Sequence, residues 1–348
     1  MARADRPGRG ATIVDVAARA GVSSMTVSRV INGRTGVNAQ TRLTVEEAIK
    51  ALAYTPNVAA RNLVTSSELR IGVIYSKPSA AFMSDFLTGV FEEASARGAR
   101  LVLLKGEDGK GPTISAVQDM VASGISGVLL APPLGEAPDV LRVLEESACI
   151  TAAVGAYQSR DTICVRIDDR AASYQMTRLI LDLGHRRLGF ILGNPDQAAS
   201  AERMAGFYAA VRETGGVDVQ VVQGDFTYMS GLHAAEQLLG STSPPTAIFA
   251  SNDDMAAAVV SVAHRRHLDV PSELTVAGFD DTTAAVTLWP PLTTVRQPVR
   301  ALAAEALSLL IAEIGQKGRK SRAPQERILE HEIVERQSTC APRSPPSS

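Results

Sequence analysis

The chain has 348 residues, a hydrophobic fraction of 45% and a formal net charge of −2, which allows two or three domains with sizeable cores. It has neither an apolar run near the ~18 residues of a membrane-spanning helix nor a secretory signal after its basic start, so we expect a cytoplasmic protein. The three cysteines are scattered along the chain, which favours buried thiols over disulfides or a metal site.

The charge is unevenly distributed along the chain. Residues 1–63 carry nine Lys or Arg and four Asp or Glu side chains, a charge of +5, whereas the remainder carries −7. A basic head on an acidic body favours phosphate contact through the head alone, although chance segregation in a short window is the other explanation. Residues 1–10 have the Arg-, Gly- and Pro-rich composition of a disordered arm.

Residues 12–32 have the pattern of two short helices joined by a tight turn. Thr12 can cap the first helix, Gly21 can end it, and Ser23 can cap the second. The pattern fits either an ordinary surface hairpin or a helix-turn-helix, which places its second helix in the major groove of DNA. The predicted apolar faces are Ile13, Val16, Ala17 and Ala20 on the first helix, and Val27, Val30 and Ile31 on the second.

A third helix is predicted over residues 39–52, capped by Asn38. Its residues Leu43, Ala48, Ile49 and Leu52 are expected to face the first two helices. The following stretch, residues 53–67, is predicted to be a linker, because Pro56 ends any helix before it. Asn57 can cap a short helix over 58–64, which would be marginal alone in water, so a plain tether is the alternative.

From residue 70 onward, short Val/Ile/Leu runs alternate with helical stretches. Such runs are typical of buried parallel strands, and nine of them indicate two doubly wound subdomains. The predicted strands are 70–76, 99–104, 127–132, 150–154, 162–168, 187–193, 219–223, 247–252 and 274–280. Residues 299–314 follow as a strongly apolar helix, and residues 327–334 are predicted to form one last strand in the second subdomain.

Polar residues end several of these runs, where ligands sit in parallel sheets. They are Ser76, Asp168, Asn252, Asp253, Asp280 and Asp281. Each can instead be the N-cap of the following helix, and one of Asn252 and Asp253 is expected to have that role. Together with Arg203, their carboxylate, amide and guanidinium groups could bind the hydroxyl groups of a sugar.

Several blocks of the sequence resemble the lactose-repressor (LacI/GalR) family of bacterial regulators. In the head these are ArgAlaGlyValSer (19–23), ThrValSerArgValIleAsn (26–32), TyrThrProAsn (54–57) and AlaArgAsnLeu (60–63). In the body they are ArgMetAlaGlyPhe (203–207), SerAsnAspAspMetAla (251–256), ValAlaGlyPheAspAspThr (276–282) and ProProLeuThrThrValArgGlnPro (290–298). The resemblance implies an all-α helix-turn-helix headpiece with a hinge helix, then an α/β body of the periplasmic-binding-protein type with two doubly wound parallel-sheet subdomains.

For the headpiece, the resemblance implies sequence-specific binding to double-stranded operator DNA. We expect Ser24, Met25 and Arg29 to touch base edges, with Arg29 the best candidate for guanine. The expected phosphate contacts are Thr12, Ser23, Thr26, Ser28, Asn32, Thr41 and Tyr54. The hinge residues implied by the resemblance are Asn57, Ala60 and Leu63, with Leu63 as a minor-groove wedge.

For the body, the resemblance implies a small-molecule effector, by default a sugar that relieves repression, bound between the subdomains. The implied effector-binding residues are Ser76, Phe82, Phe86, Asp168, Arg203, Phe226, Asn252, Asp280 and Gln297. Gly155 and Ala131 depart from the Asp and Asn of some sugar-binding members, which leaves the identity of the sugar open. Trp289 is expected to be buried in a core or an interface rather than stacked on a ligand.

The resulting organisation has a headpiece (1–56), a hinge (57–67), a body (68–340) and a disordered tail (341–348). The predicted first subdomain spans about 68–167 plus 298–323, and the second about 168–297 plus 324–340. Without terminal leucine heptads, a homodimer on a near-palindromic operator is expected rather than a tetramer.

Two other classes of protein fit less well. A sugar-processing enzyme lacks support, because the chain has no GxxxxGK[ST], GxSxG or HExxH motif and its five histidines are dispersed. A transport binding protein would need a secretory signal and would not carry the headpiece. We therefore expect no catalytic site, cofactor or metal.

Overall fold

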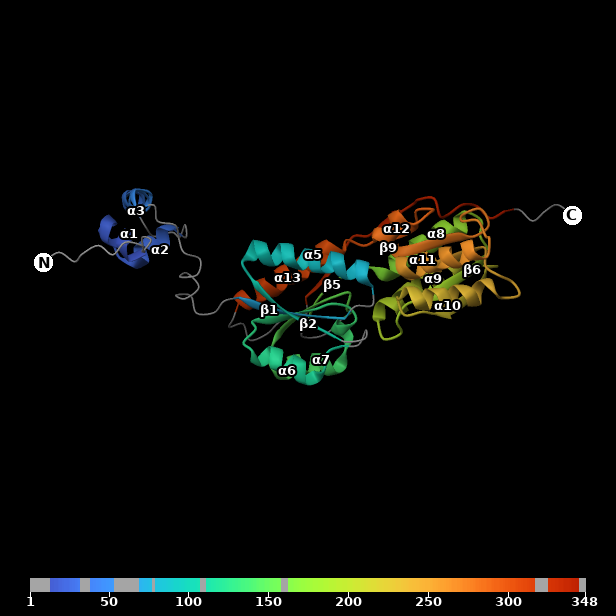
Figure 1. Ribbon diagram of the computed structural model, residues 1–348, viewed down its shortest axis with the longest axis horizontal. Coiled ribbons are helices and arrows are strands. Elements are labelled where there is room, and N and C mark those ends of the chain that lie inside the picture. Colours follow the sequence, from blue (N-terminus) through green and yellow to red (C-terminus); the bar gives the residue numbers. More distant parts are fainter. Residues whose placement is uncertain are drawn as a thin grey trace. The chain divides into compact units, whose positions relative to one another are not determined.

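The computed structural model describes residues 13–31, 38–52, 69–76, 79–106, 111–157, 162–316 and 325–343. The chain divides into two compact units, Met1–Glu68 and Leu69–Ser348. The first unit, the headpiece, contains α1 (Ile13–Ala20), α2 (Ser24–Ile31) and α3 (Ala39–Ala51), shown in blue in Figure 1.

Local capping in the headpiece follows the predicted pattern. The Ser23 hydroxyl accepts the Thr26 N–H at 3.2 Å, and Asn38 Oδ1 accepts the Thr41 N–H at 2.7 Å. Gly21 takes the left-handed conformation, with φ +67°, that turns the chain between α1 and α2. The predicted boundaries of these helices are therefore confirmed where the structure describes them.

The headpiece has a hydrophobic core between its three helices. Among the side chains that the structure describes there, the buried ones are Val16, Ala17, Val27, Val30, Val45 and Ala48. The prediction that Leu43 faces α1 and α2 was wrong, because Leu43 is 54% exposed and Val45 is fully buried instead.

The second unit, the body, contains a first six-stranded sheet in the order β11-β5-β4-β3-β1-β2. All its strand pairs are parallel. Figure 1 shows α5 and α13 on one face of this sheet and α6 and α7 on the other. The bounds are β1 (Arg70–Tyr75), α5 (Ala80–Arg97), β2 (Arg100–Lys105), α6 (Ile114–Ala122), β3 (Gly127–Leu130), η1 (Leu134–Glu136), α7 (Pro138–Glu146), β4 (Ile150–Val154), β5 (Thr162–Ile167), α13 (Val299–Gly315) and β11 (Glu326–Leu329).

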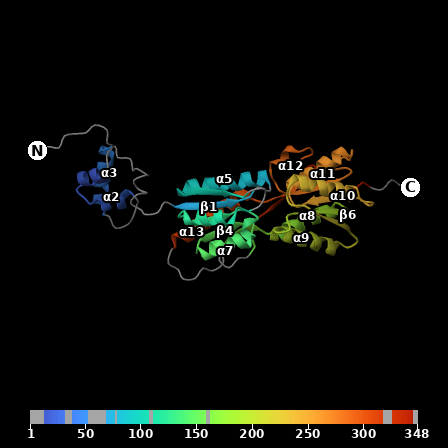
Figure 2. The ribbon, with the colours of Figure 1, turned by 60° about the horizontal axis from the view of Figure 1, so that its bottom comes forward.

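The second sheet of the body has the order β12-β10-β9-β8-β6-β7. Its pairs are parallel except for β10 and β12, which are antiparallel. Helices α8 and α9 cover one face, and α10 and α11 cover the other (Figure 2). The bounds are α8 (Asp169–Asp182), β6 (Arg187–Leu192), α9 (Ala198–Thr214), β7 (Asp218–Gln223), α10 (Tyr228–Leu239), β8 (Ala247–Ala250), α11 (Asp253–Arg265), β9 (Thr275–Asp280), α12 (Thr283–Thr287), β10 (Thr293–Arg296) and β12 (Glu332–Val334).

All nine predicted strands are present, within a few residues of their expected ends. The strand predicted over 327–334 was wrong in one respect: it is two strands in two sheets. Residues 326–329 form β11, which pairs with β5 of the first sheet, and residues 332–334 form β12, which pairs with β10 of the second. The first subdomain therefore extends to Leu329, beyond the predicted end at 323.

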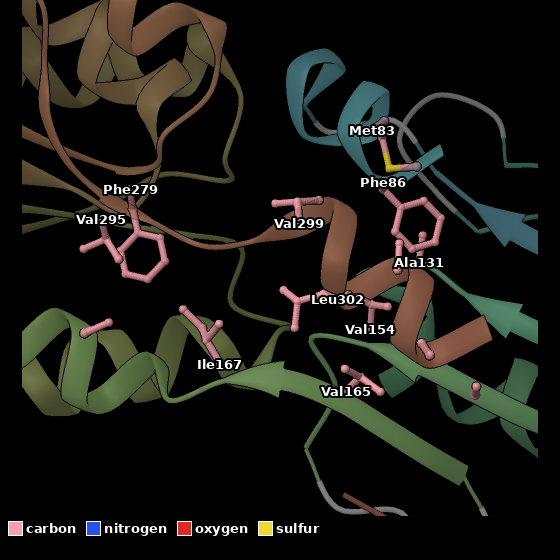
Figure 3. Packing of buried hydrophobic residues seen from close by; sticks show 14 of the residues in the cluster. Met83, Phe86, Ala131, Val154, Val165, Ile167, Phe279, Val295, Val299 and Leu302 are labelled. Carbon is pink, nitrogen blue, oxygen red and sulfur yellow. The ribbon is translucent and has the colours of Figure 1, made fainter. Parts of the chain in front are cut away.

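The chain crosses between the two subdomains three times. The crossings follow β5, β10 and β11. Figure 3 shows Val299 and Leu302 at the start of α13, between Phe279 of the second sheet and Val154 of the first. These side chains are at most 5% exposed, so apolar packing continues from one subdomain to the other beside the crossings.

Candidate functional site

The second helix of the headpiece presents two long side chains to solvent. Met25 is 67% exposed, and Arg29, one helical turn later, is also exposed. The opposite side of α2 is held by the buried residues Val27 and Val30. This arrangement fits a helix that reads base edges with one face and packs on the headpiece with the other.

The remaining predicted DNA contacts are placed only in part. The side chains of Ser24, Thr26 and Thr41 are half-buried, and Ser23 is exposed. The backbone of Ser28 is described but its side chain is not. The predicted contacts Thr12, Asn32, Tyr54, Asn57, Ala60 and Leu63, and with them the hinge helix, lie outside the described residues.

A cavity lies between the two subdomains of the body, where the carboxyl ends of both sheets meet. It encloses about 630 Å³, part of it open to solvent. Parallel sheets place ligands at this edge. The lining residues are Ser79, Phe82, Pro132, Val154, Gly155, Arg166, Ile167, Asp169, Gln197, Ala199, Arg203, Phe226, Asn252, Asp280, Gln297 and Leu302.

A buried ion pair lies among the polar residues that line the cavity. Arg203 Nε donates to Asp169 Oδ1 at 2.8 Å, and both side chains are less than 10% exposed. A second guanidinium nitrogen of Arg203 donates to the Ser251 carbonyl at 2.5 Å. The guanidinium lies 3.6 Å above the centre of the Phe279 ring, so one face is covered by an aromatic surface. Arg203 is therefore held in one orientation, as a binding site requires.

Asp280 brings a second carboxyl group to the cavity. Its backbone has φ 112° and the next residue has φ 58°, conformations that are rare for residues other than glycine and that turn the chain sharply after β9. Gln297 Nε2 donates to Asp280 Oδ1 at 2.6 Å. Burial raises the pKa of Asp280 well above its ordinary value, although the positive charge of Arg203 opposes this.

Asn252 has the capping role that its position predicts. Its side-chain oxygen accepts the Met255 N–H at 3.0 Å, and its amide nitrogen donates to the Phe226 carbonyl at 2.9 Å. This second bond holds Phe226, which has φ 71°, against the cavity. Asn252 therefore caps α11 and also positions the backbone of Phe226 at the cavity.

Asp253 is buried behind the cavity. It accepts hydrogen bonds from the Thr282 N–H at 2.7 Å and from the Thr294 hydroxyl at 2.6 Å. Burial raises its pKa to about 7, against these bonds. Asp253 does not line the cavity and instead ties β9 and β10 to the start of α11.

Six of the nine predicted effector residues line the cavity: Phe82, Arg203, Phe226, Asn252, Asp280 and Gln297. The acid after β5 that lines the cavity is Asp169, one residue after the predicted Asp168. Asp168 is exposed and caps α8 by accepting the Ala171 N–H at 2.9 Å, while Asp169 lines the cavity. Ser76 and Phe86 are fully buried and are not among the lining residues, and Phe86 packs in the core.

Sequence reasoning missed Asp169, Arg166 and Ser79. A pair of acids after a strand was the available signal for Asp169, since one acid caps the helix and leaves the other for the cavity. Trp289 is 73% exposed, so its expected burial in a core was wrong, and it does not line the cavity. No group of three His, Cys, Asp or Glu side chains within the described ranges could hold a metal ion. None of the helices searched there is long and apolar enough to cross a membrane.

Comparison with known proteins gives matches in both units. Residues 12–57 match the family described as bacterial regulatory proteins, lacI family, and residues 177–339 match a periplasmic binding protein-like domain. Catabolite control protein A of Priestia megaterium is 31% identical over 331 residues, which cover 94% of this chain and 99% of that protein. The HTH-type transcriptional repressor PurR of Salmonella newport (strain SL254) is 33% identical over 336 residues, covering 95% and 97%.

Two solved structures resemble the whole chain. A complex of the transcriptional regulator CelR with cellobiose has a TM-score of 0.71 and 31% identity, covering 94% of this chain and 99% of that one. The lac repressor dimer bound to operator and the anti-inducer ONPF has a TM-score of 0.71 and 27% identity, covering 96% and 100%.

Proposed function

This chain belongs to the lacI family of bacterial regulatory proteins, and we propose that it represses sugar-utilisation genes until a small sugar binds in the cavity of its body. The family makes it a DNA-binding transcriptional regulator with an effector domain, and its relatives are regulators rather than enzymes. We further infer that it acts in the cytoplasm, associated with the nucleoid when it is bound to DNA.

The combination of apolar and polar side chains in the cavity carries the proposal of a sugar. Pro132, Val154 and Phe82 of the first subdomain offer an apolar surface, and Phe226 of the second adds an aromatic ring. Arg203, Asp169 and Asp280 of the second subdomain offer buried ionisable groups within one network. A pyranose has an apolar ring face and a rim of hydroxyl groups, which match the apolar surface and the polar network. The relative CelR was solved with cellobiose, so a glucose disaccharide is the first sugar to test.

For the DNA, we propose a homodimer that places one α2 helix in each half-site of a near-palindromic operator. Arg29 has the length and donors for a bidentate contact with guanine, and Met25 offers an apolar contact, for example with a thymine methyl group. Support comes from the exposure of both side chains and from the relative lac repressor, which was solved as a dimer on its operator.

We propose that the effector acts on DNA binding by changing the relative angle of the two subdomains. Because the cavity is lined from both sides, a bound sugar favours the arrangement that fits it best. For this coupling, the effector must bind one arrangement of the subdomains more tightly than the other by about 1–3 kcal/mol. In the dimer, this change alters the spacing of the two headpieces.

The test is selection of genomic fragments by the full-length protein, sequenced with and without a panel of sugars that begins with cellobiose. A short palindrome that is lost in the presence of one sugar is the expected result. Recovery of a palindrome only when a sugar is present would show that the sugar is a corepressor rather than an inducer. Recovery of no enriched sequence under any condition would refute specific DNA recognition.

The proposed hinge wedge has its own test. Leu63→Ala should reduce affinity for the selected operator far more than affinity for unrelated DNA, because a wedge acts only where it kinks its site. Fluorescence anisotropy with both DNAs measures this ratio. Equal losses on both would show that residue 63 is part of a plain tether.

A further inference from the structure

Helix α9 begins without a cap from its own segment. Gln197, at the cap position, makes no side-chain hydrogen bond to the helix start. The first backbone N–H groups of a helix need acceptors, and a buried helix start without them is costly. In this structure the Ala198 N–H donates to Glu136 Oε2 at 2.9 Å. Glu136 ends η1 in the first subdomain, so α9 is capped from across the cavity.

The position of Glu136 is fixed by its own subdomain. Leu134 is buried, and Gly135 packs so closely on β4 that a Cβ atom there would lie 2.6 Å from the Cβ of Ala153. Burial raises the pKa of Glu136, against the two N–H groups that donate to it. Burial of a charged carboxylate is unfavourable unless hydrogen bonds compensate for the lost water. One of the two N–H groups that do so here, that of Ala198, belongs to the other subdomain.

Glu136 is also connected to the ion pair of the cavity. Its Oε1 accepts the Tyr157 N–H at 3.2 Å. The Tyr157 hydroxyl donates to Asp169 Oδ2 at 3.0 Å, and Asp169 Oδ1 accepts from Arg203. Two pairs of hydrogen bonds, joined through the covalent structure of Tyr157, therefore connect the start of α9 with the guanidinium that lines the cavity.

A second helix start at the cavity belongs to the first subdomain. Ser79 is the N-cap of α5, where its oxygen accepts the Phe82 N–H at 3.3 Å. Ser79 and Phe82 line the cavity from the first subdomain, as Gln197 and Ala199 at the start of α9 do from the second.

We propose that Glu136 is a positioning residue that holds the two walls of the effector cavity at their binding distance. It belongs to the first subdomain, and the helix start that it caps carries Gln197 and Ala199, which line the opposite wall. Its charge-assisted hydrogen bond with the Ala198 N–H forms only when the subdomains approach. Loss of this link therefore shifts the ligand-free protein toward an arrangement with separated walls.

The experiment is hydrogen exchange of the full-length protein without ligand, so it does not depend on the sugar proposal. Glu136→Gln leaves one carbonyl acceptor for two N–H donors. We expect exchange to rise about tenfold at the start of α9, the order expected for losing a charge-assisted hydrogen bond. We expect a similar rise at the start of α5, which Glu136 does not touch. Glu146→Gln, an exposed change in the same subdomain, should alter neither.

The distant response at α5 separates positioning from local capping. Faster exchange at α9 alone would make Glu136 a simple cap and overturn the proposal. The variant Tyr157→Phe, which removes the hydrogen bond from the Tyr157 hydroxyl to Asp169 across the subdomains, is also expected to raise exchange at the start of α9, and failure to do so would overturn the proposal. If Glu136→Gln raised exchange throughout both sheets, Tyr157→Phe would decide by the same criterion.

Discussion

The buried pair of Arg203 and Asp169 allows a prediction about stability and function together. Arg203→Met keeps the length of the side chain but removes the guanidinium. Asp169, whose side chain is 3% exposed, would then keep one donor, the Tyr157 hydroxyl. Leaving one partner of a buried ion pair uncompensated costs about 3–5 kcal/mol. For a unit of this size that corresponds to a fall in Tm of roughly 6 to 20 °C.

The double variant Asp169→Asn with Arg203→Met should recover most of this loss. An asparagine at residue 169 carries no charge and still accepts from Tyr157, so no charge remains buried alone. We expect a coupling energy of about 2 kcal/mol or more between the two sites, because they share one contact. Calorimetry of the wild type, both single variants and the double variant, following the body transition, gives this number.

The same double variant tests the role of the guanidinium in the response. It should retain operator affinity, because the headpiece is unchanged, and it should lose the response to the sugar found in the selection. Additive losses of stability in the double variant would refute the reasoning about the pair. An unchanged response at the same sugar concentration would refute the assignment of Arg203 to the effector site.

Three further predictions follow from single side chains. Val45→Ala should destabilise the headpiece by about 2 kcal/mol and weaken operator binding on warming. Leu43→Ala, at an exposed position, should do neither. Circular dichroism melts of both variants measure the effect on stability, and equal effects would contradict the assigned core. Met25→Ala should change the base preferred at one operator position without changing Tm, as a randomised-operator selection would show; an unchanged preference would mean that Met25 makes no base contact. As pH rises from 5 to 8, the Asp253→Asn variant should become more stable relative to the wild type. Because burial raises the pKa of Asp253 to about 7 in the folded state, the folded wild type holds a proton that the unfolded chain has already lost, so the free energy of unfolding of the wild type falls as pH rises toward 7. The asparagine variant has no such proton and lacks this loss. Parallel stability curves for the two proteins would show that Asp253 does not titrate in this range.

The sequence predicted the strands well because they are buried on both faces. The run over 247–250, AlaIlePheAla, is apolar throughout and is followed at once by polar residues, so both its type and its end are evident. The last strand is different. In residues 327–334, two apolar pairs flank the polar residues 330–332 with no glycine or proline between them, so nothing local indicates that the chain changes sheets after Leu329.

The choice between Asp168 and Asp169 is difficult from sequence, since a capping residue and a cavity-lining residue can be neighbours of the same chemistry. Asp168 and Asp169 differ by about 100° around the start of α8, and one caps the helix while the other faces Arg203. Contacts across the cavity, such as that of Glu136 with α9, depend on how two subdomains approach each other. No periodicity within either segment contains that information.

The triple crossing between the subdomains also determines the order in which the body can be completed during synthesis. The first sheet receives its helix α13 and its edge strand β11 only after all of the second subdomain except β12 has been made. Until then β5 has an open edge, of the kind that pairs with other chains. Residues 326–334 then close both sheets almost together. A ribosome that stops before this point releases a chain in which neither subdomain is finished, however much of its sequence is already present.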